Sequence, residues 1–126
     1  YSSTMKSIAI IGASKDRSKF GNKAVRVYKD KGFKVFPINP KEDEIENLKC
    51  YKSVLDIEED IDLASLYLPK DIGLKIIEEV SKKHIKEIYL NPGADSEEVI
   101  EECKKLGVKP LVKCSIIAIG ASPSDY

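Results

Sequence analysis

The chain has 126 residues, of which 42% are hydrophobic and 33% are charged, and its formal net charge is zero. This length fits one domain with a core of its own, and the neutral balance argues against a nucleic-acid or membrane surface. No apolar run approaches the roughly 20 residues that span a bilayer, and no signal-peptide pattern precedes Met5.

The cysteines and the cationic residues indicate the redox compartment and the type of source organism. The three cysteines are odd in number and show no CxxC spacing, which disfavours a disulfide framework and a metal site. A reducing, cytoplasmic location is therefore predicted. The cations are almost all Lys, a composition compatible with a thermophilic source.

The chain begins with a strand, a loop and a helix. Residues 7–11 form a continuous apolar run that predicts a strand buried on both faces and ended by Gly12. A polar loop follows over 13–19, and a helix is expected to begin near Gly21 and to end at Gly32. The apolar face of this helix is formed by Phe20, Ala24, Val27 and Tyr28.

The middle of the chain continues the alternation. Residues 34–38 predict a second strand, in which Pro37 lacks a ladder donor and indicates an edge or irregular position. A charged connection over 41–60 precedes a predicted strand at 63–68. The apolar face of the next helix is formed by Ile72, Ile76, Ile77 and Val80.

The last third repeats the pattern. A strand is predicted at 87–90, followed by a helix for which Asp95 and Glu98 resemble a capping box. A final strand is predicted at 109–112, and the apolar residues 116–119 are expected to add a strand or helix to the core or to form a dimer patch. The helix before the final strand has an apolar face of Val99, Cys103 and Leu106.

Alternating strands and helices predict an α/β fold, a Rossmann-like three-layer sandwich with a mostly parallel sheet of about five strands. We expect this domain to span residues 5–120. Residues 1–4 and 121–126 are expected to be disordered ends or remnants of an added sequence. In such sheets ligands bind outside the carboxyl ends of the strands, so the loops after the strands are the candidate sites.

The loop after the first strand has the features of an anion site. Gly12 permits close approach of a ligand to the backbone, and the following helix start offers unpaired N–H groups and a positive dipole end. Positive charge nearby comes from Lys15, Arg17, Lys19 and Lys23. The alternative is a tight strand–helix turn beside a solvated basic face.

The ligand is not predicted to be NAD. A GxGxxG fingerprint needs glycines where Ser14 and Arg17 stand, and no Walker A ending is present. NAD-binding proteins also carry an acidic residue near the end of the second strand, whereas residues 36–41 contain no carboxylate. Lys41 at this position favours a ligand with a phosphorylated ribose.

The chain resembles the CoA-binding protein family over residues 6–119. The same fold forms the CoA-binding domain of succinyl-CoA synthetase alpha subunits and of ADP-forming acyl-CoA synthetases. The segments that carry the resemblance are residues 8–14 (IAIIGAS), 19–23 (KFGNK), 35–41 (VFPINPK), 62–69 (DLASLYLP) and 91–94 (NPGA).

The resemblance implies how the phosphates of coenzyme A are bound. Gly12, Ala13 and Ser14 would hold the pyrophosphate, and Lys15 or Arg17 would screen its charge.

It also implies the sites of the other parts of the ligand. Asn39 and Pro40 would flank the ribose and the adenine, and Lys41 would meet the 3′-phosphate. Leu68 and Pro69 would pack against the adenine or the start of the pantetheine arm.

The path of the arm and the chemistry at its end are the least determined. Asn91, Pro92 and Gly93 would line the arm, although prolines also simply terminate strands. His84 precedes the amino end of a strand, on the side away from the ligand, so we expect no catalytic role for it. Cys114 follows the last strand on the ligand side, where it either meets the CoA sulfur or is an ordinary half-buried thiol.

Three functions remain open from the sequence. The first is non-catalytic binding of coenzyme A or an acyl-CoA, with no catalytic residues and no metal. The second is a detached CoA-binding subunit of an NDP-forming acyl-CoA synthetase, which requires a partner chain with the phosphorylated histidine and an ATP-grasp region. The third is an NAD(H)-linked redox sensor, against which the missing carboxylate argues. The expected partners are CoA or acyl-CoA, and a second copy of the chain or an acyl-CoA enzyme.

Overall fold

The computed structural model describes residues 5–126, so the expectation for residues 1–4 lies outside it. Its main sheet has five strands, and every neighbouring pair is parallel. The strand order is β2-β1-β5-β6-β7, with bounds β1 (Ser7–Ile11), β2 (Lys34–Ile38), β5 (Leu63–Leu66), β6 (Glu87–Leu90) and β7 (Lys109–Val112). The predicted sheet is confirmed, and β2 with Pro37 lies at its edge.

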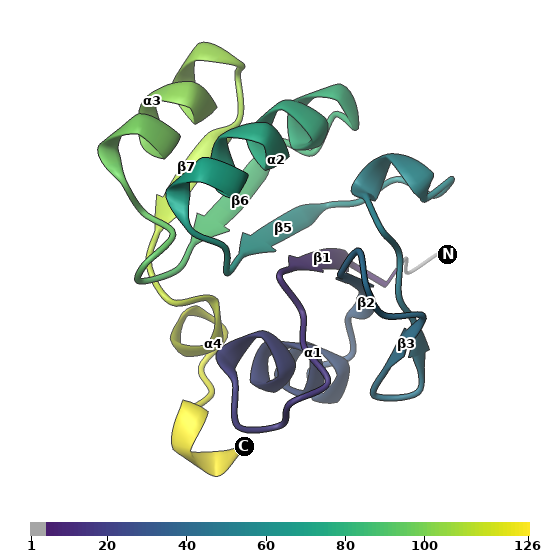
Figure 1. The fold of residues 1–126 in the computed structure, drawn as a ribbon. Helices are drawn as coiled ribbons and strands as arrows, with labels where there is room; N and C mark the ends of the chain where they lie inside the picture. The colour runs from purple at the N-terminus through teal and green to yellow at the C-terminus, as the bar shows by residue number, and fades with distance from the viewer. Residues whose placement is uncertain (1–4) are drawn as a thin grey trace.

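Helices cover both faces of the sheet, which confirms the three-layer sandwich (Figure 1). On one face lie α2 (Lys70–Lys82) and α3 (Glu97–Lys105), and on the other lie α1 (Phe20–Asp30) and α4 (Ser115–Ala118). Among residues 5–126 no helix is both long and apolar enough to cross a bilayer.

The central strand β1 explains why its sequence is apolar without alternation. Ala9 and Ile11 pack into the core beneath α2 and α3, while Ile8 and Ile10 pack into the core beneath α1 and α4. None of these four side chains is more than 1% exposed. A strand covered on both faces therefore needs an apolar residue at every position.

The charged connection contains structure that the sequence pattern did not predict. Two-residue strands β3 (Glu44–Ile45) and β4 (Leu48–Lys49) pair antiparallel around a turn in which Glu46 and Asn47 have φ of 51° and 63°. A short 3₁₀ helix, η1 (Val54–Asp56), follows and is capped by Ser53. Elements this short carry no measurable periodicity.

Two local expectations were wrong. The cap of α3 is Ser96, whose Oγ accepts the N–H of Val99 at 3.2 Å, rather than Asp95. Asp95 instead accepts the N–H of Gly93 at 3.3 Å. Phe20, counted on the apolar face of its helix, is 52% exposed because it is the first residue of α1.

The C-terminal segment packs against α1, and the expectation that residues 121–126 are a disordered or added end stays a prediction. Its short 3₁₀ helix η2 (Pro123–Asp125) accepts a hydrogen bond from Lys23 Nζ at the Pro123 carbonyl, 3.1 Å away. Upstream, residues 115–118 form helix α4 rather than a strand. Ile116 of α4 is fully buried and Ile117 is 64% exposed.

The strand order reverses between β1 and β5. The chain goes outward from β1 to β2 and then returns to the other side of β1 to build β5, β6 and β7. Loops after β1 and β5 therefore diverge to opposite faces of the sheet, and they leave a crevice at the carboxyl ends of the strands.

Candidate functional site

A cleft of about 380 Å³ lies at this reversal point, over the carboxyl ends of β1, β2 and β5. It brings together half of the residues predicted for the site, namely Gly12, Ala13, Ser14, Lys19, Asn39, Pro40 and Leu68. It also has walls that the sequence did not predict: Ile11, Ile38, Lys52, Tyr67, Ile72, Ile76 and Glu79.

Two glycines allow the start of α1 to lie close to the end of β1. Gly12 has φ of +94°, and a Cβ there would lie 3.1 Å from Cγ of Leu68. A Cβ on Gly21, in the first turn of α1, would overlap the carbonyl oxygen of Gly12. Both positions therefore need glycine, and the close approach brings the N-terminus of α1 to the cleft.

The loop's own hydrogen bonds decide which groups remain free for a ligand. The N–H groups of Gly12 and Ala13 both donate to the Ile38 carbonyl, at 3.1 and 3.2 Å, and so join β1 to β2. The N–H of Ser14 has no acceptor among the described residues. Its Oγ accepts the N–H of Asp16 at 3.0 Å, which leaves the hydroxyl proton available.

The N-terminus of α1 adds further donors. Its N-cap residue is Lys19, whose side chain makes no capping bond. The N–H of Asn22 donates to the Lys19 carbonyl at 3.1 Å, whereas the N–H groups of Phe20 and Gly21 have no acceptor among the described residues. With the dipole end and the Lys19 ammonium beside them, these groups form a site for an anion.

Asn22, for which no role was predicted, holds the loop in place. Its side chain is fully buried, and its Nδ2 donates to the Ser14 carbonyl at 2.9 Å and to Glu46 Oε2 at 3.0 Å. Its Oδ1 accepts from Arg26 Nε at 2.7 Å, and Arg26 donates in turn to the Arg17 carbonyl at 2.8 Å. A buried amide thus fixes the backbone at both ends of the loop.

The cations predicted for this loop differ in whether they reach the cleft. Lys15 pairs with Glu42 at 3.3 Å and Arg17 with Glu46 at 3.4 Å, and neither cation lines the cleft. Lys19 lines the cleft and forms no ion pair within the described residues. Lys19 is therefore the cation of this loop that is available inside the cleft.

The loop after β2 forms the second wall. Asn39 Nδ2 donates to the Ala13 carbonyl at 2.8 Å, and its Oδ1 accepts the N–H of Lys41 at 2.8 Å. These bonds join the two loops and set the turn that carries Pro40 into the cleft wall. Lys41 is exposed just beyond this wall.

Helix α2 and the segment before η1 form the end of the cleft that is farther from the loop after β1. Ile72, Ile76 and Glu79 lie at i, i+4 and i+7 on one face of α2. Lys52 faces the same space from the segment after β4. The spacing on α2 was visible in the sequence, but it was assigned wholly to the core.

The predicted arm-binding residues lie outside the cleft. Pro69 is the exposed N-cap of α2, and Pro92 and Gly93 are exposed after β6. Asn91 is buried, and its Nδ2 donates to Ser65 Oγ at 2.9 Å. Its Nδ2 also donates to the Leu66 carbonyl, and its Oδ1 accepts the N–H that begins α4, both at 2.8 Å.

The remaining predicted groups are spread over the molecule. Cys114 is half-buried at the N-cap of α4. His84 is exposed just before β6, where it lines a hollow with Asp60 and Lys109 at the amino ends of the strands. This position is at the opposite end of the sheet from the cleft.

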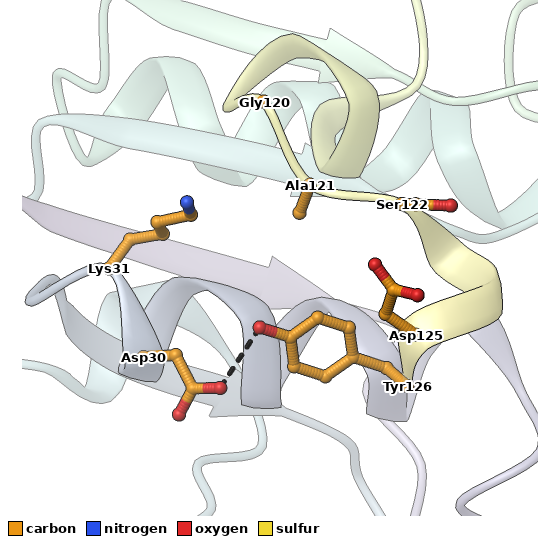
Figure 2. A pocket seen from close by; sticks show the side chains of 7 residues that line it. All are labelled: Asp30, Lys31, Gly120, Ala121, Ser122, Asp125 and Tyr126. Atoms are coloured by element: carbon orange, nitrogen blue, oxygen red, sulfur yellow. Dashed lines mark hydrogen bonds between the residues drawn. The ribbon is translucent and has the colours of Figure 1, made fainter.

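A further hollow of about 480 Å³ lies where the C-terminal segment meets the end of α1 (Figure 2). Its wall is polar, and Tyr126 OH donates to Asp30 Oδ2 at 2.9 Å across it. It lies at the opposite end of α1 from Lys19. None of the predicted site residues lines it.

Comparison with known proteins gives a consistent result. The family described as CoA binding domain matches residues 6–120. An ADP-forming acetate–CoA ligase from Methanocaldococcus jannaschii is 52% identical over 86 residues, which are 68% of this chain and 12% of that ligase. The chain thus spans about an eighth of the length of that relative.

Two solved structures share the fold. A conserved hypothetical protein from Pyrococcus furiosus has a TM-score of 0.79 at 35% identity, over 92% of this chain and 98% of that one. A dinucleotide forming acetyl-coenzyme A synthetase from Ca. Korarchaeum cryptofilum, in complex with phosphate and ADP, has a TM-score of 0.76 at 32% identity. It matches over 88% of this chain and 26% of that one.

Proposed function

The chain belongs to the CoA-binding domain family, and on this premise we propose that it binds coenzyme A or an acyl-CoA in the cleft over β1, β2 and β5. One observation carries the proposal. The cleft has hydrogen-bond donors and positive charge on one side and an apolar wall on the other. The first side consists of the free donors of Ser14, the N-terminus of α1 without a side-chain cap, and Lys19, which has no ion partner among the described residues. A nucleotide with a pyrophosphate needs both surfaces.

The pyrophosphate lies on the α1 side. Ser14 donates through its N–H and its hydroxyl, and the first turn of α1 and the Lys19 ammonium add charge. Gly12 and Ala13 contribute by close approach rather than by their N–H groups, which Ile38 already occupies. Lys15 and Arg17 screen the phosphates from outside the cleft, with their acidic partners weakening the effect.

The nucleoside lies on the β2 side. Pro40 from the loop after β2 and Leu68 from the loop after β5 flank the adenine, and Asn39 fixes the turn that presents Pro40. Lys41, at the exposed edge of this turn, meets the 3′-phosphate. The pantetheine arm leaves over Pro69 toward the loop after β6.

The loop after β6 contacts the arm mainly through backbone. The side chain of Asn91 is already satisfied by three buried hydrogen bonds. Pro92 and Gly93 are exposed and present the contact surface. Cys114 stands beyond them as the thiol nearest to the end of the arm in the predicted path.

We propose that the chain itself binds without catalysing. Its single histidine, His84, lies at the amino ends of the strands, away from the cleft. The second candidate, a detached CoA-binding subunit of an ADP-forming acyl-CoA synthetase, is favoured by the ligase relative, of which the chain covers 12%. In that case a partner chain supplies the phosphorylated histidine and the nucleotide site. The cytoplasmic location and a homodimer remain predictions.

Thermal melting with added ligands tests the proposed function. Coenzyme A is expected to raise the melting temperature more than NAD or ATP at equal concentration, because stabilisation follows affinity for the folded state. Equal or greater stabilisation by NAD would favour a redox sensor and contradict the proposal.

A turnover assay separates the two candidates. The isolated chain, mixed with acetyl-CoA, ADP, magnesium and phosphate, is expected to form no ATP. Formation of ATP by the chain alone would contradict non-catalytic binding. Formation only after addition of a partner chain would support the detached subunit.

A further inference from the structure

The far end of the cleft holds two opposite charges that do not pair with each other. Glu79 and Lys52 both line it, yet no ion pair joins them or connects either to another described residue. Because neither charged group has an ion partner among the described residues, each can bind a charged or polar group of a ligand in the cleft.

Glu79 is held in one orientation. Ser53 Oγ accepts the N–H of Leu55 at 3.1 Å, so its single proton goes to Glu79 Oε1, 2.5 Å away. Lys83, one turn further along α2, donates to the Ile57 carbonyl instead of to Glu79. The second carboxylate oxygen therefore remains as an unoccupied, fixed acceptor.

The surroundings of Glu79 fit a flat ring. Ile72 and Ile76 precede it on the same face of α2, and Ile38 and Pro40 come from β2 and the loop after it. Ile72 is 48% exposed and so presents apolar surface to a ligand in the cleft. Over the seven residues from Ile72 to Glu79 the helix rises about 10 Å, enough for a purine with polar edge groups at its end.

We propose that Glu79 accepts a hydrogen bond from the exocyclic amine of the adenine, and that Lys52 donates to N7, the ring nitrogen on the same edge of the base. The inference rests on the proposed function, because it takes the base to lie at this end. Adenine offers an amine donor next to an acceptor nitrogen, whereas guanine and hypoxanthine place a carbonyl acceptor where the amine stands. A fixed carboxylate repels that carbonyl, so Glu79 is the residue that selects adenine.

The test compares CoA with its hypoxanthine analogue, which has a carbonyl in place of the amine and a proton on N1 and keeps N7 unchanged. Dissociation constants are measured by calorimetry for the wild type, Glu79→Gln and the control Glu78→Gln. Glu78 is exposed one residue away and pairs with Lys82. The wild type and Glu78→Gln are expected to prefer CoA about tenfold.

Glu79→Gln is expected to bring the two ligands within about twofold, because its amide can accept from the amine or donate to the carbonyl. Ser53 Oγ can donate to the Gln oxygen or accept from the Gln amide, so either end of the amide can face the ligand and the contact with Ser53 is kept. Lys52→Ala is expected to weaken both ligands equally, because N7 is an acceptor in both bases. An unchanged preference in Glu79→Gln, or a lost one in Lys52→Ala, would overturn the inference.

The outcome also separates this inference from the proposed function. If CoA binds the wild type with no preference over its analogue, the reading of the base by Glu79 fails and CoA binding stands. If neither ligand binds, CoA binding itself is wrong, and the inference fails with it.

Discussion

Replacing Asn22 tests whether the loop after β1 is held ready for the ligand. In Asn22→Ala the Ser14 carbonyl, Glu46 and Arg26 each lose a hydrogen bond. Ser14, Glu46 and Arg26 are all only partly buried, so water replaces part of the bonding that each of them loses.

The magnitude follows from these bonds. Each of the three lost hydrogen bonds costs about 1 kcal/mol, and less where water regains the partner. We therefore expect the free energy of unfolding to fall by about 2 kcal/mol. For a domain of this size that lowers the melting temperature by roughly 6–10 °C. CoA affinity is expected to fall about tenfold, because Ser14 must be ordered on binding.

Asn22→Asp is the deciding comparison. Asp has the shape of Asn but, as a carboxylate, cannot donate to the Ser14 carbonyl and meets the Glu46 carboxylate. Thermal melts and CoA titrations should show Asp to be at least as damaging as Ala. If Asp preserves both stability and affinity, side-chain volume matters and the hydrogen-bond argument is refuted.

Two further predictions concern packing and thiol reactivity. Gly21→Ala should lower both the stability in urea and the CoA affinity, because the added Cβ overlaps the Gly12 carbonyl at the end of β1. The control Gly73→Ala should be near neutral in both measurements, because its Cβ meets nothing closer than 3.4 Å. Burial raises the pKa of Cys103 to about 11 and raises that of Cys50, so little thiolate exists at pH 8. Iodoacetamide at that pH should therefore modify half-buried Cys114 first, and mass spectrometry showing Cys103 as the fastest site would contradict this.

The sheet and one wall of the cleft were predictable because local sequence determines them. A strand covered on both faces is apolar along its buried length, as residues 8–11 are. The edge position of β2 followed from Pro37, and the crevice beside Gly12 followed from the alternation of strands and helices. These features depend on neighbours in the chain or on topology rules that hold for all parallel sheets.

The rest depended on contacts between distant segments. The short strands β3 and β4 place Glu46 beside Arg17 and beside Asn22, which lies 24 residues earlier in the chain. No periodicity in the sequence predicts these contacts. Lys52 and Glu79 face one cleft from the charged connection and from α2. Their individual sequence contexts are typical of solvated surface, so only the fold reveals that they share a site.

The most direct test of CoA binding at this cleft is a calorimetric comparison of CoA with dephospho-CoA, which lacks only the 3′-phosphate. The wild type is expected to prefer CoA by a few-fold to tenfold, less at high salt, through the exposed Lys41. Lys41→Ala should bring the two affinities together, while Ser14→Ala should weaken both ligands equally through the shared pyrophosphate. Absence of any preference in the wild type, or an equal loss for both ligands in Lys41→Ala, would contradict the account.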